Sequence, residues 1–128
     1  QPGVIVSSAR ALAAQGWPVR YRPHPLMRGV DRGPGDVPVS TATLDEDLAG
    51  AALCVTYSST TGVEAVLAGV PTIAMGRGSM ARAVAGHTLG EVVRPSREAW
   101  AHRLAWAQWD RDELASGAAW TALLVAKP

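Results

Sequence analysis

The sequence has little that could crosslink the chain, anchor it in a membrane or attract a polyanion. Its one cysteine, Cys54, excludes an intramolecular disulfide and is best explained as a small core residue. No apolar run reaches the roughly 18 residues of a membrane span, and no signal peptide opens the sequence. A formal net charge of +1 gives no electrostatic case for nucleic acid or an anionic membrane. We therefore expect a soluble, cytoplasmic protein.

Phenylalanine and asparagine are absent, and arginine almost entirely replaces lysine. This skew is typical of a GC-rich genome and says little about function. The 128 residues suit one domain that buries roughly two-thirds of its unfolded surface. Because the sequence begins at Gln1 rather than at methionine, we expect a fragment of a longer protein.

Helical and strand-like patterns alternate along the first 95 residues, which is typical of a parallel sheet covered on both faces. Thr43 and Glu46 have the spacing of a capping box. The predicted helices span residues 3–15, 43–50 and 62–68, the predicted strands span 19–22, 53–57 and 71–75, and residues 37–41 could hold a further short strand.

The tail differs, because it holds four of the five tryptophans. Residues 96–109 and 110–126 predict two helices, and Asp110 with Glu113 would form a capping box at the start of the second. The tryptophans most simply pack this tail onto the preceding domain, and ring stacking on a ligand is the alternative.

Three loops follow predicted strands: Pro23-His24-Pro25, Ser58 to Gly62, and Gly76 to Ser79. In an open parallel sheet, ligands bind outside the carboxyl ends of the strands. Small residues in the second and third loops let backbone N–H groups approach a phosphate, and the helix predicted after Gly62 adds unpaired N–H groups. The sequence therefore predicts an anion site at one edge of the sheet.

His24, between two prolines, is held stiffly outside any regular element. It is either a solvated loop histidine, or a phosphate contact or proton donor, since an unperturbed imidazole has a pKa near ~6.5. Arg20 and Arg22 share one face of a predicted strand. They are either solvated there, or one of them pairs with a phosphate.

Three other chemistries have weaker support. Gly76 to Ala81 matches the dinucleotide pattern G-x-G-x-x-A, but Glu98, about 20 positions on, falls in a predicted helix rather than at a strand end. The hydrolase pattern G-x-S-x-G is absent, and neither Ser58 nor Ser59 has a partner base in sequence. The three histidines lack metal-ligand spacing, so we predict no metal and no cofactor.

Three segments, in order and spacing, resemble the C-terminal half of GT-B glycosyltransferases. They are Tyr21-Arg-Pro-His-Pro25, Val55-Thr-Tyr-Ser-Ser-Thr-Thr-Gly-Val-Glu-Ala65 and Ala68-Gly-Val-Pro71. The nearest kin are capsule polysaccharide biosynthesis proteins of the Kdo-transferase type, and CDP-glycerol glycerophosphotransferases are similar. The core of the resemblance covers residues 19–79, and the tail also resembles that of bacterial and phage-borne relatives.

The resemblance implies a Rossmann-like, nucleotide-binding domain over residues 1–95 that lacks its first strand, with a helical tail over 96–128. It implies that His24 lies near the leaving phosphate as the catalytic residue and that Glu64 accepts hydrogen bonds from the ribose. The other residues expected to bind the nucleotide-sugar are Arg22, Ser58, Ser59, Thr60 and Gly62. Since the N-terminal acceptor domain is missing, we do not expect these 128 residues to catalyse transfer alone.

The leading hypothesis is the donor-binding half of a glycosyltransferase that moves a sugar from a nucleotide-sugar to a glycan acceptor of the cell surface. A UDP-sugar epimerase, a phage glycosyltransferase acting on DNA and a non-catalytic interaction module are the alternatives. Glu64 also has a purely structural interpretation, because Thr61-Gly-Val-Glu64 is itself a capping-box pattern.

Overall fold

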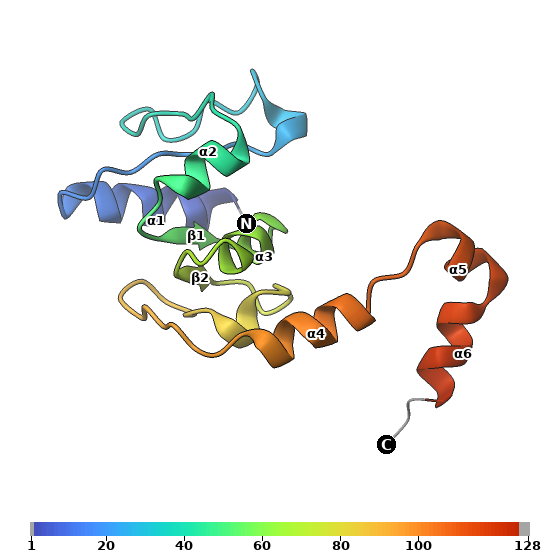
Figure 1. Cartoon of the computed structure of the whole chain (residues 1–128). Coiled ribbons are helices and arrows are strands. Elements are labelled where there is room, and N and C mark those ends of the chain that lie inside the picture. Colours follow the sequence, from blue (N-terminus) through green and yellow to red (C-terminus); the bar gives the residue numbers. More distant parts are fainter. Residues whose placement is uncertain (1, 126–128) are drawn as a thin grey trace. The chain divides into compact units, whose positions relative to one another are not determined.

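The computed structural model describes residues 2–125, and the chain divides into two compact units, Gln1–Pro95 and Ser96–Pro128. The described residues form six α-helices and one small sheet of two parallel strands, so the protein is of mixed α/β class (Figure 1). No helix within residues 2–125 combines the length and the apolar character needed to cross a membrane.

The first unit holds both strands and the first three helices. Its elements are α1 (Pro2–Ala14), a 3-10 turn η1 (Pro25–Met27), α2 (Leu44–Ala49), β1 (Cys54–Thr56), α3 (Thr61–Leu67), β2 (Thr72–Ala74) and a second 3-10 turn η2 (Arg82–Val84).

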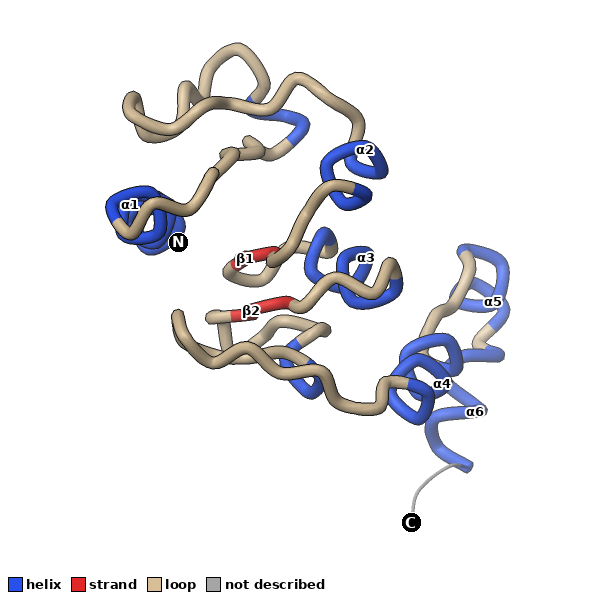
Figure 2. Tube along the Cα trace, turned by 60° about the vertical axis from the view of Figure 1, so that its left-hand side comes forward, coloured by secondary structure: helices blue, strands red, loops and turns tan. Residues whose placement is uncertain are grey.

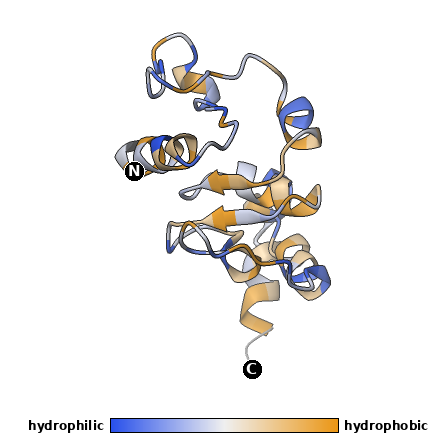
Figure 3. Ribbon diagram, turned by 90° about the vertical axis from the view of Figure 1, so that its left-hand side faces the viewer, coloured by the Kyte–Doolittle hydropathy of each residue, from blue (hydrophilic) through white to orange (hydrophobic). Residues whose placement is uncertain are grey.

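The two strands pair in parallel, with Cys54 opposite Thr72 and Thr56 opposite Ala74. The predicted parallel pairing of these segments is therefore confirmed. Ile73 and Ala74 are wholly buried, and the strand arrows carry mainly the hydrophobic colour in Figure 3. Such continuous apolar character is typical of strands that are covered on both faces.

The sheet is smaller than predicted. The segments expected as strands at 19–22 and 37–41 meet only in an isolated parallel bridge between Tyr21 and Val39. Prolines explain this, because Pro18, Pro23 and Pro38 flank the bridge and have no N–H to extend a ladder. On the other side of the pair, Ile73 forms a second isolated parallel bridge with Gly86.

Helices lie on both sides of the strand pair. In Figures 1 and 2, α1 and α3 lie on opposite sides of β1 and β2. The close packing of α3 depends on Gly62, which is buried and would place a Cβ only 2.8 Å from Thr56 Cγ2. Cys54 packs beside the buried core of Leu48, Ala65 and Val70, and burial raises the pKa of its thiol to about 11.

Two predicted capping boxes are present. At α2, the Thr43 N–H donates to Glu46 Oε2 at 2.8 Å, and the Glu46 N–H donates to Thr43 Oγ1 at 3.3 Å. At α5 (Arg111–Ser116), Asp110 and Glu113 make the equivalent pair of bonds. Each box satisfies backbone donors that the first helical turn cannot satisfy internally.

In its described part, residues 96–125, the second unit contains three helices rather than the predicted two. They are α4 (Glu98–Trp106), α5 and α6 (Ala118–Val125). Gly117 divides the last two, because it adopts the left-handed conformation (φ 80°) that ends α5. The predicted end of the second helix, Ala126, lies outside the described residues. The rings of Trp106 and Trp109 pack edge to face with centroids 5.8 Å apart.

We predict that Gly62→Ala lowers the free energy of unfolding by about 1–3 kcal/mol, because the new methyl overlaps Thr56 Cγ2. Thr56→Ser removes that methyl group and keeps the hydroxyl, so the double variant should be more stable than Gly62→Ala alone. Urea unfolding measures both. Gly50→Ala is the control, since its new Cβ meets nothing within 4 Å. Equal stability of the two alanine variants would contradict the prediction.

Candidate functional site

The Ser58–Gly62 loop leaves the carboxyl end of β1 and leads into α3. Ser59 holds this loop together from within. Its N–H donates to the buried hydroxyl of Thr56 (3.3 Å), and its own hydroxyl accepts from the Thr61 N–H (3.2 Å) and donates to Thr61 Oγ1 (3.1 Å). Ser59 therefore stabilises the conformation of the loop, and its hydroxyl already has hydrogen-bond partners within the loop.

The hydroxyls on either side of Ser59 are differently placed. Ser58 and Thr60 are exposed, and within residues 2–125 the Ser58 side chain has no hydrogen-bond partner. Thr60 starts α3 through its carbonyl, which accepts from Val63 and Glu64, while its side chain makes no capping bond in the described part of the chain. Both hydroxyls can therefore contact a ligand at the strand end.

The capping-box interpretation of Glu64 is wrong. The helix begins one residue earlier than that pattern requires, with Thr60 as its N-cap. The Thr61 hydroxyl is instead bonded to Ser59, which competes for it. Glu64 is exposed, and in the described residues no hydrogen bond or ion pair reaches its carboxylate.

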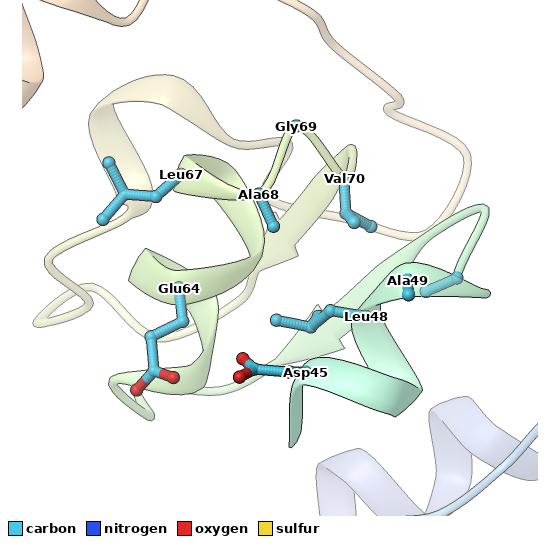
Figure 4. Close-up of a pocket in the computed structure, with 9 residues that line it drawn as sticks. Asp45, Leu48, Ala49, Glu64, Leu67, Ala68, Gly69 and Val70 are labelled. Carbon is cyan, nitrogen blue, oxygen red and sulfur yellow. The ribbon is translucent and has the colours of Figure 1, made fainter. Parts of the chain in front are cut away.

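Glu64 lies on the wall of an open pocket of about 600 Å³ between α2 and α3. Figure 4 shows its carboxylate and that of Asp45 turned toward the same space, with Leu48 and Val70 forming an apolar wall. Two carboxylates repel a phosphate but accept hydrogen bonds from hydroxyl groups. Sequence reasoning missed Asp45, although the spacing of Asp45 and Leu48 puts them on one helix face.

Arg20 and Arg22 both bind Asp47 of α2. Each guanidinium donates to a different carboxylate oxygen at 2.8 Å, and Arg22 also donates to the Ala42 carbonyl at 2.7 Å. Partial burial acts to raise the pKa of Asp47, but hydrogen bonds from Ser40 and the two arginines outweigh it, so the pKa lies below its usual value. Both guanidinium groups therefore already have hydrogen-bond partners within the chain. The assignment of Arg22 to a nucleotide-sugar stays a prediction.

His24 is exposed at the start of η1. Its Nδ1 accepts a hydrogen bond from the Leu26 N–H at 3.2 Å, so the neutral ring carries its proton on Nε2. No hydrogen bond links His24 to the Ser58–Gly62 loop in the part of the chain that the structure describes. The catalytic assignment of His24 therefore stays a prediction.

The third predicted loop begins against Tyr57, the residue that directly precedes the second loop. The Gly76 N–H donates to the Tyr57 carbonyl at 2.7 Å, and a Cβ at position 76 would lie 2.7 Å from that same oxygen. Only glycine leaves room for this close contact between the segment that follows β2 and the segment that follows β1. Two of the three predicted loops share one edge of the sheet, as parallel strands require.

Within residues 2–125, no group of three or more histidine, cysteine, aspartate or glutamate side chains could hold a metal ion. Comparison of the chain with protein-family models, curated proteins and solved structures gave no match. The inference of function therefore depends on the geometry of the loop and pocket and on the sequence resemblance.

We predict that Asp47→Asn lowers the free energy of unfolding at pH 7 by about 1–3 kcal/mol, because two charge-assisted hydrogen bonds lose their anion. Since the folded-state pKa of Asp47 is depressed, its contribution is present above the unfolded pKa of about 3.9 and is lost as pH falls through the folded value. Urea unfolding between pH 7 and pH 3 should show the two proteins converging in acid.

Asp36→Asn is the matched control. Its ion pair with Arg10 is exposed on both sides (57% and 60% of the two side chains), so solvent screens it and the loss of stability should be much smaller than that of Asp47→Asn. An Asp47→Asn variant as stable as Asp36→Asn at pH 7 would show that the Asp47 pairs contribute little.

Proposed function

We propose that this chain is the donor-nucleotide-binding half of a glycosyltransferase, which takes a nucleotide-sugar and delivers the sugar to a surface-glycan acceptor. The proposal combines the sequence resemblance with one observation at the end of β1. Two exposed hydroxyls, those of Ser58 and Thr60, precede a carboxylate on Glu64 for which the described residues provide no partner.

The two kinds of group suit the two halves of a nucleotide-sugar. Hydroxyl donors suit phosphate oxygens, whereas the backbone N–H groups of Thr61, Gly62 and Val63 at the start of α3 are already bonded within the chain. A carboxylate instead suits a ribose, because it can accept from two neighbouring hydroxyls at once. The phosphates would then lie at the loop and the ribose at Glu64.

The acidic pocket supports one direction for the proposed donor. Because Asp45 and Glu64 face the same space, a phosphate placed there would meet two like charges. A neutral, hydroxyl-rich group meets acceptors instead, and the apolar wall of Leu48 and Val70 can pack against the face of a ring. This arrangement favours phosphates on the strand-end side and the ribose toward the pocket.

His24 is the proposed proton donor or phosphate contact at the leaving group. Its Nδ1 is held by the Leu26 N–H, so Nε2 is the nitrogen that would donate. Arg22 would reach a phosphate only by exchanging Asp47 for it. The acceptor site belongs to a further domain in this proposal, so the chain by itself would bind donor without transferring sugar.

We predict that Glu64→Gln leaves the melting temperature almost unchanged but weakens nucleotide binding about tenfold or more. Glutamine keeps the length of the side chain and loses the charge that strengthens two hydroxyl hydrogen bonds, and about 1.4 kcal/mol corresponds to a factor of ten. Calorimetric titration with UDP, CDP, CMP, ADP and GDP identifies the base and measures the loss.

Glu98→Gln, at the start of α4 in the second unit, is the control for removing one exposed carboxylate. Equal binding of ribose and 2′,3′-dideoxyribose forms of the preferred nucleotide would remove Glu64 from the site. Failure of all five nucleotides to bind the unmutated chain would favour the interaction module over the enzyme.

We predict that His24→Asn weakens binding of the nucleoside diphosphate more than binding of the nucleoside. Asparagine is a good N-cap and can keep the bond to the Leu26 N–H, whereas the imidazole that would meet the phosphate is lost. His24→Ala removes both the capping hydrogen bond and the imidazole. A difference in melting temperature between the Asn and Ala variants therefore measures the contribution of the capping bond. Equal losses for both ligands would place His24 away from the phosphates.

A further inference from the structure

A short turn between α1 and α2 exposes three large apolar side chains. Leu26, Met27 and Val30, which we call the apolar tip, are 86%, 45% and 73% exposed. Single exposed apolar residues are common, but three of them within five consecutive residues form a patch, and patches usually mark interaction sites. Figure 1 shows this light-blue segment at the border of the first unit, on the side of β1 away from β2.

Hydrogen bonds hold the turn in this conformation. The N–H groups of Val30 and Asp31 both donate to the Met27 carbonyl, at 3.0 and 2.8 Å. At the base of the turn, the Asp31 carboxylate accepts from the Tyr21 hydroxyl at 2.7 Å and from the Gly33 N–H at 2.8 Å. A preformed turn loses little conformational entropy on binding, so the apolar tip can meet a partner without refolding.

Cations lie beside the apolar tip in the sequence, whereas the acidic residues of this loop are already bonded. Arg28 and Arg32 are exposed, and within residues 2–125 neither forms an ion pair. The carboxylate of Asp31 is bonded within the loop, and that of Asp36 pairs with Arg10. The net charge of +1 for the whole chain therefore conceals a local excess of positive charge at the turn.

We propose that the apolar tip, with Arg28 and Arg32, is a membrane-surface anchor that inserts into the headgroup region of an anionic lipid bilayer. The apolar side chains would enter the boundary between headgroups and acyl chains, and the guanidinium groups would bind lipid phosphates. This anchor goes beyond the proposed nucleotide site and does not depend on it.

Size and charge favour a bilayer over a protein as the partner. A stable protein interface needs roughly 800 Å² from each side, which is more than three side chains can supply. A lipid surface needs no matching groove, and it offers apolar depth and negative charge in one place. With few groups inserted, the association is weak and reversible.

The test is co-sedimentation of the 128-residue chain with lipid vesicles, without nucleotide, which keeps the result independent of the proposed function. Vesicles of phosphatidylcholine are compared with vesicles that also contain phosphatidylglycerol. We expect binding to the mixed vesicles that weakens about tenfold or more in Leu26→Ser. Arg28→Gln and Arg32→Gln should each weaken it by about fivefold, and salt should weaken it further. These side chains are exposed, so the melting temperature should stay almost unchanged.

The matched controls are exposed residues of the second unit. Leu124 is 61% exposed on α6 and Arg111 is exposed on α5, so Leu124→Ser and Arg111→Gln remove the same groups elsewhere. Both variants should bind the mixed vesicles like the unmutated chain.

No binding to the mixed vesicles would overturn the proposal, as would equal losses in the tip variants and the controls. Equal binding to vesicles with and without phosphatidylglycerol would overturn the role of the two arginines. Self-association of the unmutated chain that is lost in Leu26→Ser, without vesicle binding, would show that a second copy covers the apolar tip. That outcome would also overturn the proposal.

Discussion

The close contact of Gly62 with Thr56 is the constraint on which the rest of the first unit depends. Strands of three residues and a helix of seven are too short to be stable separately. They persist because α3 packs directly onto both strands and buries Ala65 and Val66. The same contact fixes where the loop before α3 leaves the sheet, so it also places the hydroxyls of Ser58 and Thr60.

A single carboxylate stabilises the other part of this unit. Asp47 binds Arg20, Arg22 and Ser40 at once and so ties α2 to the two segments that meet at the Tyr21–Val39 bridge. Backbone ladders usually hold such segments, but the flanking prolines prevent one here. Side-chain hydrogen bonds to a charged group therefore replace the missing main-chain bonds, and they make this region sensitive to acid.

The features that could be predicted from the sequence are those that depend on residues close together along the chain. Apolar runs at 53–57 and 71–75 gave the parallel strands, and Thr43 and Asp110 gave their capping boxes. The Asp47 network could not be predicted, because its partners lie 25 and 27 residues away and depend on tertiary structure. The capping box that was the alternative interpretation of Glu64 does not form, because Ser59 bonds to the Thr61 hydroxyl and the helix begins one residue earlier. Gly117 could be seen as a helix end only after its left-handed conformation was known.

Because Cys54 lies beside the core of the first unit, its reactivity can be used to measure local unfolding of that core. Because burial raises the pKa of its thiol to about 11, the folded chain holds very little thiolate at neutral pH and resists alkylation and oxidation. Cys54 is the only cysteine and lies on β1 beside the core of α2 and α3. Its rate of modification therefore measures how often this core opens, with no other thiol contributing to the signal.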